Sequence, residues 1–204
     1  EIMNKFDLLP VQNFRFGADP NAYKINGELW KEQFDHSGPD GCWLGCTMGC
    51  AHGVKHYHLQ TGPYKGELVF VDGPEYETLG ALGSNCAIFD PGAVLEMNFY
   101  ADTYGIDTIS LGNSIAFAME CYEYGILTKE NTGGLELTWG NVQAALELIH
   151  GMAAGEGFGM IVGQGVRGMK RIFVEQYGAD PVVLQEIGME MKGLEVSEYM
   201  TKES

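Results

Sequence analysis

The chain has 204 residues and a mass of 22.3 kDa, enough for one ordinary globular domain with a buried core and no disulfide staples. Its 12 Lys and Arg against 28 Asp and Glu give a formal charge of −16, which argues against nucleic-acid binding and against attachment to anionic lipid. The first residues lack the pattern of a signal peptide, and no apolar stretch is long enough to cross a bilayer. We therefore expect a cytoplasmic protein.

The first part of the chain predicts little regular structure. Residues 1–38 are punctuated by Pro, Asn and Asp, which indicates irregular structure that packs through its aromatic side chains. Residues 66–73, Gly-Glu-Leu-Val-Phe-Val-Asp-Gly, predict a short extended segment closed by an Asp-Gly-Pro turn. We expect this segment to be the only clear strand.

The second part of the chain has the periodicity of helices. Apolar residues recur at intervals of three and four over 93–104, 113–124, 141–154 and 162–177. Pro91 suits the start of the first helix, and Asn113 or Ser114 is the expected N-cap of the second, which should end at Gly125. The fourth helix should end at Gly178.

These patterns predict a mainly α fold, a multihelical domain with a short irregular or β approach segment at its N-terminal side. We expect one domain over 1–204, with the irregular segment over 1–90 and the helices over 91–204. The sequence shows no internal repeat and no break in composition that would divide it.

Three cysteines carry the strongest chemical signal. Cys42, Cys46 and Cys50 fall within nine residues, each separated from the next by three. Helical spacing would put the three thiols on one face, which suits a shared metal better than mutual disulfides. Thiolates are the ligands of iron–sulfur clusters, and Gly45 and Gly49 would let the backbone wrap closely around a bulky cluster.

Two other interpretations of the cysteines stay open on the residues alone. Zinc would use the same three thiols and one of the histidines that follow, His52, His56 or His58. Alternatively, the three cysteines are small buried side chains that pack in a core, as free cysteine often does. Packing is the better interpretation for Cys86 and Cys121, which stand alone among apolar residues.

Three further segments combine with the cysteines into a family resemblance. They are Gly-Pro-Glu-Tyr-Glu-Thr-Leu-Gly over 73–80, Ala-Asp-Thr-Tyr-Gly-Ile-Asp-Thr-Ile-Ser over 101–110, and Met-Glu-Met-Lys-Gly-Leu-Glu over 189–195. In this order, behind an Asn-Phe-Arg segment and the cysteine run, they resemble the tungsten- or molybdenum-dependent aldehyde:ferredoxin oxidoreductase family. The resemblance covers nearly the whole chain and corresponds to the middle helical domain of that family.

The resemblance implies that the chain is partial. Family members are much longer, with an N-terminal β-rich domain that holds much of a bis-pterin cofactor. A further helical domain supplies the fourth cysteine of the cluster. Missing N- and C-terminal domains or subunits are therefore among the expected partners.

The resemblance also implies roles for individual residues. Cys42, Cys46 and Cys50 would be ligands of a [4Fe–4S] cluster, although the common family spacing has two residues between the first two cysteines. The pterin-binding motif maps onto a short run of residues, Asp102, Gly105, Ile106 and Asp107. A carboxylate can accept N–H donors from a pterin, and glycine lets the ring approach the backbone. On sequence alone, helix-end capping and solvation around Gly105 is the better interpretation of both aspartates, and the resemblance reverses that preference.

An acid near the metal is the remaining role. Glu77 corresponds to the family residue that would activate water or move a proton, and Glu75, two residues earlier, is the alternative. Some family members carry Glu-x-x-His at a metal on a dimer interface. The matching stretch over 96–99, Glu-Met-Asn-Phe, has no histidine. We therefore do not expect that metal, while a homodimer stays open.

The resemblance implies the activity as well. An aldehyde would become a carboxylate at a bis-pterin tungsten or molybdenum centre, and the [4Fe–4S] cluster would pass electrons to ferredoxin in an anaerobic setting. The cofactor would carry the redox chemistry and the protein would position it. The alternative is a zinc- or cluster-stabilised helical module used for protein contacts, which would fold only with its metal.

Overall fold

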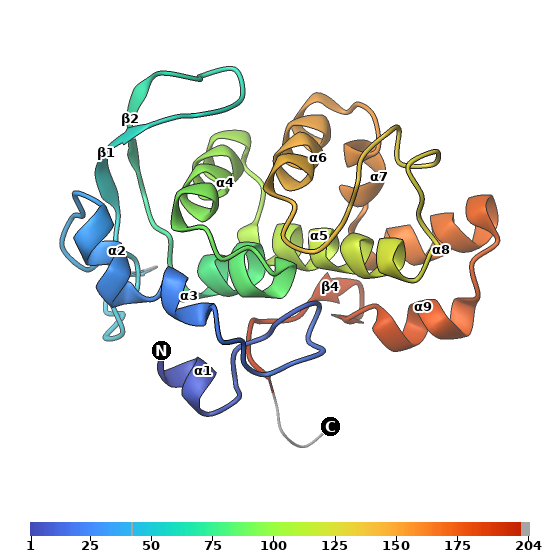
Figure 1. Ribbon diagram of the computed structural model, residues 1–204, viewed down its shortest axis with the longest axis horizontal. Coiled ribbons are helices and arrows are strands. Elements are labelled where there is room, and N and C mark those ends of the chain that lie inside the picture. Colours follow the sequence, from blue (N-terminus) through green and yellow to red (C-terminus); the bar gives the residue numbers. More distant parts are fainter. Residues whose placement is uncertain (42, 201–204) are drawn as a thin grey trace.

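The computed structural model describes residues 1–41 and 43–200, and these confirm a mainly α, multihelical fold with only short strands (Figure 1). The N-terminal elements are α1 (Ile2–Lys5), the 3-10 turn η1 (Ala22–Ile25) and α2 (Gly27–Gln33). The middle elements are β1 (Val54–His58), β2 (Leu68–Val71), α3 (Tyr76–Thr78), the π turn η2 (Leu79–Gly83) and the 3-10 turn η3 (Ser84–Cys86). The remaining elements are α4 (Pro91–Tyr104), α5 (Thr108–Glu123), α6 (Val142–Ala154), α7 (Gly159–Val162), α8 (Gly165–Tyr177), α9 (Pro181–Ile187), β3 (Glu190–Met191) and β4 (Leu194–Glu195).

Helix α5 is the centre of the molecule. Every residue from Leu111 to Cys121 is buried, so the helix has no solvent-facing side over three turns. Helices α4, α6 and α8 pack around it, and the ring of Phe117 stacks on Phe173 of α8 at 6.1 Å between centroids. Such a helix fixes the position of both its ends, because burial on all sides leaves it no room to slide.

One boundary of α5 differs from the prediction. The sequence favoured Asn113 or Ser114 as its N-cap, but the helix begins at Thr108, five residues earlier. Asp107 is the N-cap and its carboxylate accepts a hydrogen bond from the Ser110 N–H at 2.8 Å. Asn113 instead lies buried inside the helix, where its amide donates to the Ile109 carbonyl. A polar residue used for a buried contact was therefore mistaken for a cap.

The other predicted elements lie close to their expected places. Helix α4 starts at Pro91, α6 covers the predicted third helix, and α8 ends at Gly178 in a left-handed conformation. The predicted strand forms as β2, but it pairs antiparallel with β1, which the sequence did not predict. The sequence of β1, Val-Lys-His-Tyr-His, has only a weak apolar alternation, and pairing with β2 decides its structure.

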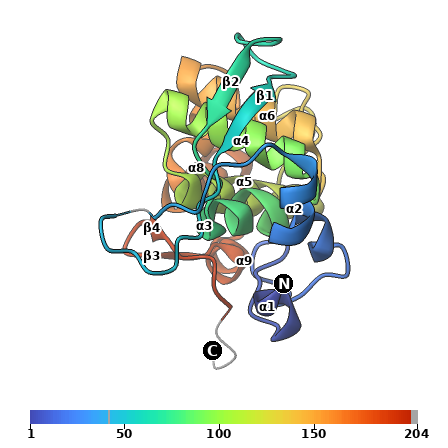
Figure 2. The same ribbon diagram turned by 90° about the vertical axis from the view of Figure 1, so that its left-hand side faces the viewer.

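The segment before β1 forms a long excursion from the body of the molecule (Figure 2). The outgoing chain pairs with the returning chain at two bridges, His36 with Val54 and Asp40 with Ala51. The Asp40 and Ala51 main chains exchange two hydrogen bonds, of 2.9 and 3.2 Å. We call residues 41–50, beyond this bridge, the cysteine loop.

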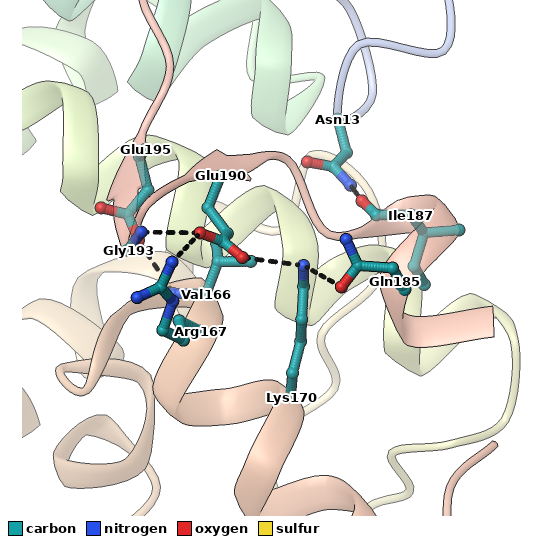
Figure 3. A network of polar contacts seen from close by, with 9 residues as sticks. All are labelled: Asn13, Val166, Arg167, Lys170, Gln185, Ile187, Glu190, Gly193 and Glu195. Atoms are coloured by element: carbon teal, nitrogen blue, oxygen red, sulfur yellow. Dashed lines mark hydrogen bonds and ion pairs between the residues drawn. The ribbon is translucent and has the colours of Figure 1, made fainter. Parts of the chain in front are cut away.

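The C-terminal strands are fastened to α8 (Figure 3). Glu190 accepts hydrogen bonds from Arg167 at 3.2 Å, from Lys170 at 3.3 Å and from the Gly193 N–H at 2.7 Å. The Glu195 carboxylate accepts the Val166 N–H at 2.8 Å. The cations and the main-chain donor lower the pKa of Glu190. Among the described residues, no helix is both long and apolar enough to span a membrane.

Candidate functional site

A polar pocket of about 300 Å³ joins three parts of the chain. We call it the carboxylate pocket; its lining residues are Asp40, Gly41, Ala51, Asp72, Gly73, Glu75, Thr78, Asn98, Asp102, Ile106, Asp107 and Thr108. They come from the base of the cysteine loop, from the turn after β2, and from the corner between α4 and α5. Five of the lining residues are acidic, and none of these described residues is Lys, Arg or His.

The α4–α5 corner brings most of the predicted pterin motif to this pocket. Gly105 ends α4 with φ +69°, a left-handed conformation that glycine adopts without strain. The chain then turns, and Asp107 caps α5. Asp102, Ile106 and Asp107 line the pocket, whereas Gly105 shapes the turn without lining it. The capping interpretation is therefore correct for Asp107, and its place at the pocket leaves a ligand role open as well.

Asp102 is the electrostatically perturbed residue of the corner. Its carboxylate lies at the exposed rim of the pocket and accepts a hydrogen bond from the Asn98 amide at 3.0 Å. Partial desolvation, the larger cause, and the neighbouring Asp72 charge together raise the pKa of Asp102 to about 6, although the Asn98 hydrogen bond works in the opposite direction. Asp102 is therefore an acceptor whose charge depends on its immediate neighbours.

Glu77 does not line the carboxylate pocket and contacts the C-terminal segment. One of its oxygens accepts the main-chain N–H of Glu198 at 2.8 Å. Burial raises the pKa of Glu77, while the hydrogen bond from Glu198 lowers it and the nearby Glu75 charge raises it. Of the two glutamates considered as the acid near the metal, Glu75 lines the pocket and Glu77 does not. The catalytic role of Glu77 stays a prediction.

Glu198 is a buried acid that the sequence did not reveal. Its side chain is inaccessible to solvent, and one oxygen accepts from Asn113 at 2.7 Å while the other has no hydrogen-bond partner. Burial raises the pKa of Glu198 to about 9, and the Glu77 charge contributes to this. The Glu198 carbonyl also accepts the Tyr76 hydroxyl at 2.7 Å, which fastens the C-terminal segment across α3.

The cysteine loop is irregular where the structure describes it. Its described residues, 41 and 43–50, form bends and turns, with left-handed Gly45 and Gly49. Cys46 and Cys50 are half-buried, and Cys42 lies outside the described residues. Helical spacing, which would put the thiols on one face, therefore does not hold between Cys46 and Cys50, because Gly49 bends the chain between them. Within the described residues, no three His, Cys, Asp or Glu side chains form a group suited to a metal ion.

A second cavity lies on the other side of the turn after β2. It has a volume of about 470 Å³ and is mostly apolar, with Trp30, Tyr76 and Leu79 among its lining residues. Cys50 and His52 also reach it, and the His52 ring contacts the Cys50 carbonyl at 3.0 Å. The cysteine loop therefore runs from the carboxylate pocket at its base to an apolar cavity at Cys50.

Glu96 has a structural role in this chain. Its buried carboxylate accepts the main-chain N–H groups of Gln60 at 3.1 Å and Thr61 at 2.6 Å, together with the Thr61 hydroxyl. The Tyr57 hydroxyl adds a longer contact at 3.4 Å. These donors hold the loop between β1 and β2 against α4.

Two pocket residues could have been found from the sequence. Asn98 lies four residues before Asp102 on α4, the spacing at which helical side chains meet. Asp72 ends the strand that precedes Gly73-Pro74. Glu198 gives no such signal, because its contacts with Glu77 and Asn113 join residues 121 and 85 positions apart.

Comparison with known proteins decides the family. The model of aldehyde ferredoxin oxidoreductase, domains 2 and 3, matches residues 1–204. The chain belongs to the aldehyde ferredoxin oxidoreductase family. It is 38% identical over 173 residues to the tungsten-containing aldehyde ferredoxin oxidoreductase of Pyrococcus horikoshii, covering 80% of this chain and 26% of that protein. It is 34% identical over 205 residues to the tungsten-containing enzyme of Pyrococcus furiosus, covering 97% of this chain and 30% of the relative.

The chain thus spans less than a third of the length of these relatives. It is also 40% identical over 112 residues to the WOR-like subunit of an aliphatic sulfonate oxidoreductase of Pyrococcus furiosus, covering 55% of this chain and 18% of that protein. Among solved structures, the active site complex BamBC of benzoyl coenzyme A reductase matches with a TM-score of 0.59 and 20% identity. The match covers 82% of this chain and 23% of that one. This last likeness shows a shared fold.

Proposed function

We propose that this chain forms the part of an aldehyde-oxidising enzyme that faces both a bis-pterin tungsten centre and a [4Fe–4S] cluster. In the complete protein an aldehyde would become a carboxylate, and the electrons would leave through the cluster to ferredoxin. Molybdenum in place of tungsten, a cytoplasmic location and missing domains on both sides belong to the same proposal. The 204 residues alone are not expected to be active, because the other domains would supply further contacts to the cofactor.

One observation carries the proposal. Asp102, Ile106 and Asp107, assigned to the pterin by resemblance, share a single pocket with the base of the cysteine loop at Asp40 and Ala51. Two groups of residues that are about 50 to 70 positions apart in the sequence therefore meet at one place. A pterin and a cluster bound there would be neighbours, as transfer of electrons between them requires.

The pocket fits a pterin ring by charge and by size. Its volume of about 300 Å³ is at the lower end of small-molecule sites. Amino and ring N–H groups of a pterin are donors, and carboxylates such as Asp102 and Asp107 are strong acceptors for them. A phosphate would be repelled by the five acidic lining residues, so the phosphate end of such a cofactor must be held elsewhere.

The cysteine loop supplies the cluster side of the proposal. Cys46 and Cys50 lie on the loop that the Asp40–Ala51 bridge closes, and the same bridge reaches the pocket. Thiolate ligands with glycines between them suit a cluster that needs close backbone approach. Cys42 would be the third ligand by its spacing, and a fourth would come from outside this chain.

The remaining chemistry belongs to the chain's own acids. The bound tungsten–pterin would supply two-electron redox chemistry. Glu77 would hold the proton that leaves the reacting water, because its half-buried carboxyl has a raised pKa and therefore takes up a proton closer to neutral pH. Glu198 would hold Glu77 in place through its main-chain N–H.

Metal and cofactor analysis of the full-length protein, purified without oxygen, tests this proposal. Iron, acid-labile sulfide, tungsten, molybdenum, zinc and released pterin would be measured together with aldehyde-dependent reduction of a one-electron dye. We expect iron and sulfide in matching amounts, with pterin and tungsten or molybdenum. Asp102→Asn should lower the pterin content, and Asp180→Asn, at the N-cap of α9, should leave it unchanged.

Two results would contradict the proposal. Zinc without iron, retained through chelator washing, would identify the cysteine loop as a zinc site and favour a module used for protein contacts. A protein that carries iron and sulfide but no pterin would leave the cluster in place and remove the aldehyde-oxidising role of the carboxylate pocket.

A further inference from the structure

Asn98 connects two walls of the carboxylate pocket. It lies on α4, one helical turn before Asp102, and is only 3% exposed. Its amide nitrogen donates to the Asp72 main-chain carbonyl at 2.8 Å and to the Asp102 carboxylate at 3.0 Å. One side chain therefore ties the turn after β2 to the acid at the rim of the pocket.

Asn98 also fits closely against the turn itself. A side chain added at Gly73 would come within 3.2 Å of the Asn98 side-chain oxygen, so the amide lies directly against this backbone. Gly73 has φ +100°, a conformation that side chains rarely adopt. The amide, the Gly73 backbone and Asp102 thus form one packed unit, and the orientation of the amide is set by the Asp72 carbonyl that it binds.

The Asp102 carboxylate depends on this one donor. Among the described residues, Asn98 makes the only side-chain hydrogen bond to Asp102, and no Lys, Arg or His of the described lining offers a cation. Asp72 and Glu75, which line the same pocket, are acidic and repel its charge. Without the amide, the carboxylate would be expected to turn toward solvent or to take up a proton.

We propose that Asn98 is a positioning residue of the pterin site, which fixes the Asp102 carboxylate against the Asp72–Gly73 turn so that it accepts N–H donors from the ring. This inference rests on the proposed function of the carboxylate pocket. It adds to that function a residue outside the Asp102–Asp107 motif. Asn98 itself donates only to the protein and need not touch the cofactor.

The test measures how firmly the full-length protein retains its pterin. The rate of pterin loss during dialysis would be followed by fluorescence of the released pterin, and tungsten or molybdenum by elemental analysis, at several pH values. We expect Asn98→Ala to lose pterin about tenfold faster, since the hydrogen bond that holds the Asp102 carboxylate in place is removed. Loss should also begin at higher pH, because the Asn98 donor keeps the pKa of Asp102 down.

Asn13 provides a matched control. Its buried amide likewise donates to one carboxylate, Glu120 at 2.6 Å. It also donates to one main-chain carbonyl, that of Ile187, at 2.7 Å (Figure 3). It is 4% exposed, does not line the pocket, and has a left-handed backbone that makes Asn13→Ala at least as disruptive to the fold. We expect Asn13→Ala to lower the melting temperature without moving the pH of pterin loss.

A double-mutant cycle separates positioning from general support. If Asn98 acts through Asp102, then Asn98→Ala should add little once Asp102→Asn is present. Asn98→Asp keeps the size of the side chain and replaces the alanine variant in this test if that variant does not fold. We expect Asn98→Asp to lose pterin faster still, because it adds a further carboxylate to the pocket.

The outcomes distinguish this inference from the proposed function. Pterin loss by Asn98→Ala at the wild-type rate and pH would overturn the positioning role, and so would an equal shift in Asn13→Ala or full additivity with Asp102→Asn. A wild-type protein without any pterin would overturn the proposed function itself.

Discussion

The two halves of the candidate site are built in opposite ways. The α4–α5 corner is fixed by a buried helix, a left-handed glycine and an aspartate cap, so it is formed by packing alone. The cysteine loop is held at its base by the Asp40–Ala51 bridge, and its outer residues Trp43, Leu44 and Met48 are 67%, 98% and 80% exposed. The corner proposed to bind the pterin is therefore preorganised, whereas the cysteine loop should depend on what it binds.

The largest expected effect comes from Gly112, on which the rigid half depends. A side-chain carbon at Gly112 would lie 2.4 Å from the Ala81 backbone, so Gly112→Val forces α5 away from η2. We expect a loss of about 3 kcal/mol or more, or no folded protein, measured by chemical denaturation. Gly27→Ala, which meets nothing within 4 Å, is the control and should be close to neutral. A Gly112→Val protein of wild-type stability would show that this packing is not rigid.

The next effect is the dependence of stability on pH that Glu198 introduces. Because the pKa of Glu198 is raised to about 9 in the folded protein, the folded state holds a proton that the unfolded state releases above its ordinary pKa. The stabilisation that Glu198 contributes to the folded state is therefore fully present at low pH and is lost as the pH rises toward 9. Glu198→Gln should flatten that decline, as measured by denaturation at pH 5 and pH 8.

Glu77 serves as a comparison for this result. Its pKa is also raised by burial, so Glu77→Gln should change the decline in the same direction but by less, since Glu77 is the more exposed acid. Parallel pH curves for the wild type and Glu198→Gln would show that Glu198 is ionised in the folded protein.

A smaller effect is expected at Asp107, and it separates two roles. Asp107→Ala should cost about 1 kcal/mol through loss of the cap on the Ser110 N–H, while Asp107→Asn keeps an oxygen acceptor and should cost less. If the carboxylate also binds pterin, Asp107→Asn should still lose pterin from the full-length protein. Asp180→Ala removes a similar cap, on α9, and this variant should keep its pterin. Full pterin retention in Asp107→Asn would leave Asp107 a cap alone.

The smallest expected effect on stability lies in the cysteine loop. In metal-free protein, Cys50→Ser should change the free energy of unfolding by less than about 0.5 kcal/mol, because the side chain is only half-buried in a loop. Cys121→Ser, inside α5, should cost about 1 to 3 kcal/mol because it buries a hydroxyl. Iron content should show the reverse order, with loss only in Cys50→Ser. Equal iron in both variants would contradict the cluster assignment.

The sequence predicted the elements of this molecule that are determined by residues close to one another in the chain. Apolar periodicity and end signals located α4, α6 and α8, since a helix start at Pro91 and an end at Gly178 depend on nearby residues. The start of α5 was not predicted because Asn113, which looks like an N-cap in the sequence, uses its amide to bind Glu198, a residue far away in the chain. An irregular cysteine segment follows from the sequence, but the helical spacing considered for the thiols fails between Cys46 and Cys50, where Gly49 turns the chain.

The candidate site divides in the same way. The resemblance identified Asp102, Ile106 and Asp107 as a group, and the structure brings them to one pocket. The spacing of four residues between Asn98 and Asp102 is visible in the sequence, but the Asn98 bond to the Asp72 carbonyl is not, because it joins residues 26 positions apart. Contacts between distant segments depend on how the whole core packs, which no short motif records.

Because of the Asp40–Ala51 bridge, the length of the cysteine loop does not affect the shape of the carboxylate pocket. Its paired main chains fix where the loop leaves and returns, so residues added or removed beyond the bridge shift neither Asp40 nor the strand that begins at Val54. Lengthening such a closed loop by one residue costs little entropy. The spacing between cysteines is therefore free to drift during evolution, or to be redesigned for a chosen metal group, while the carboxylate pocket stays the same.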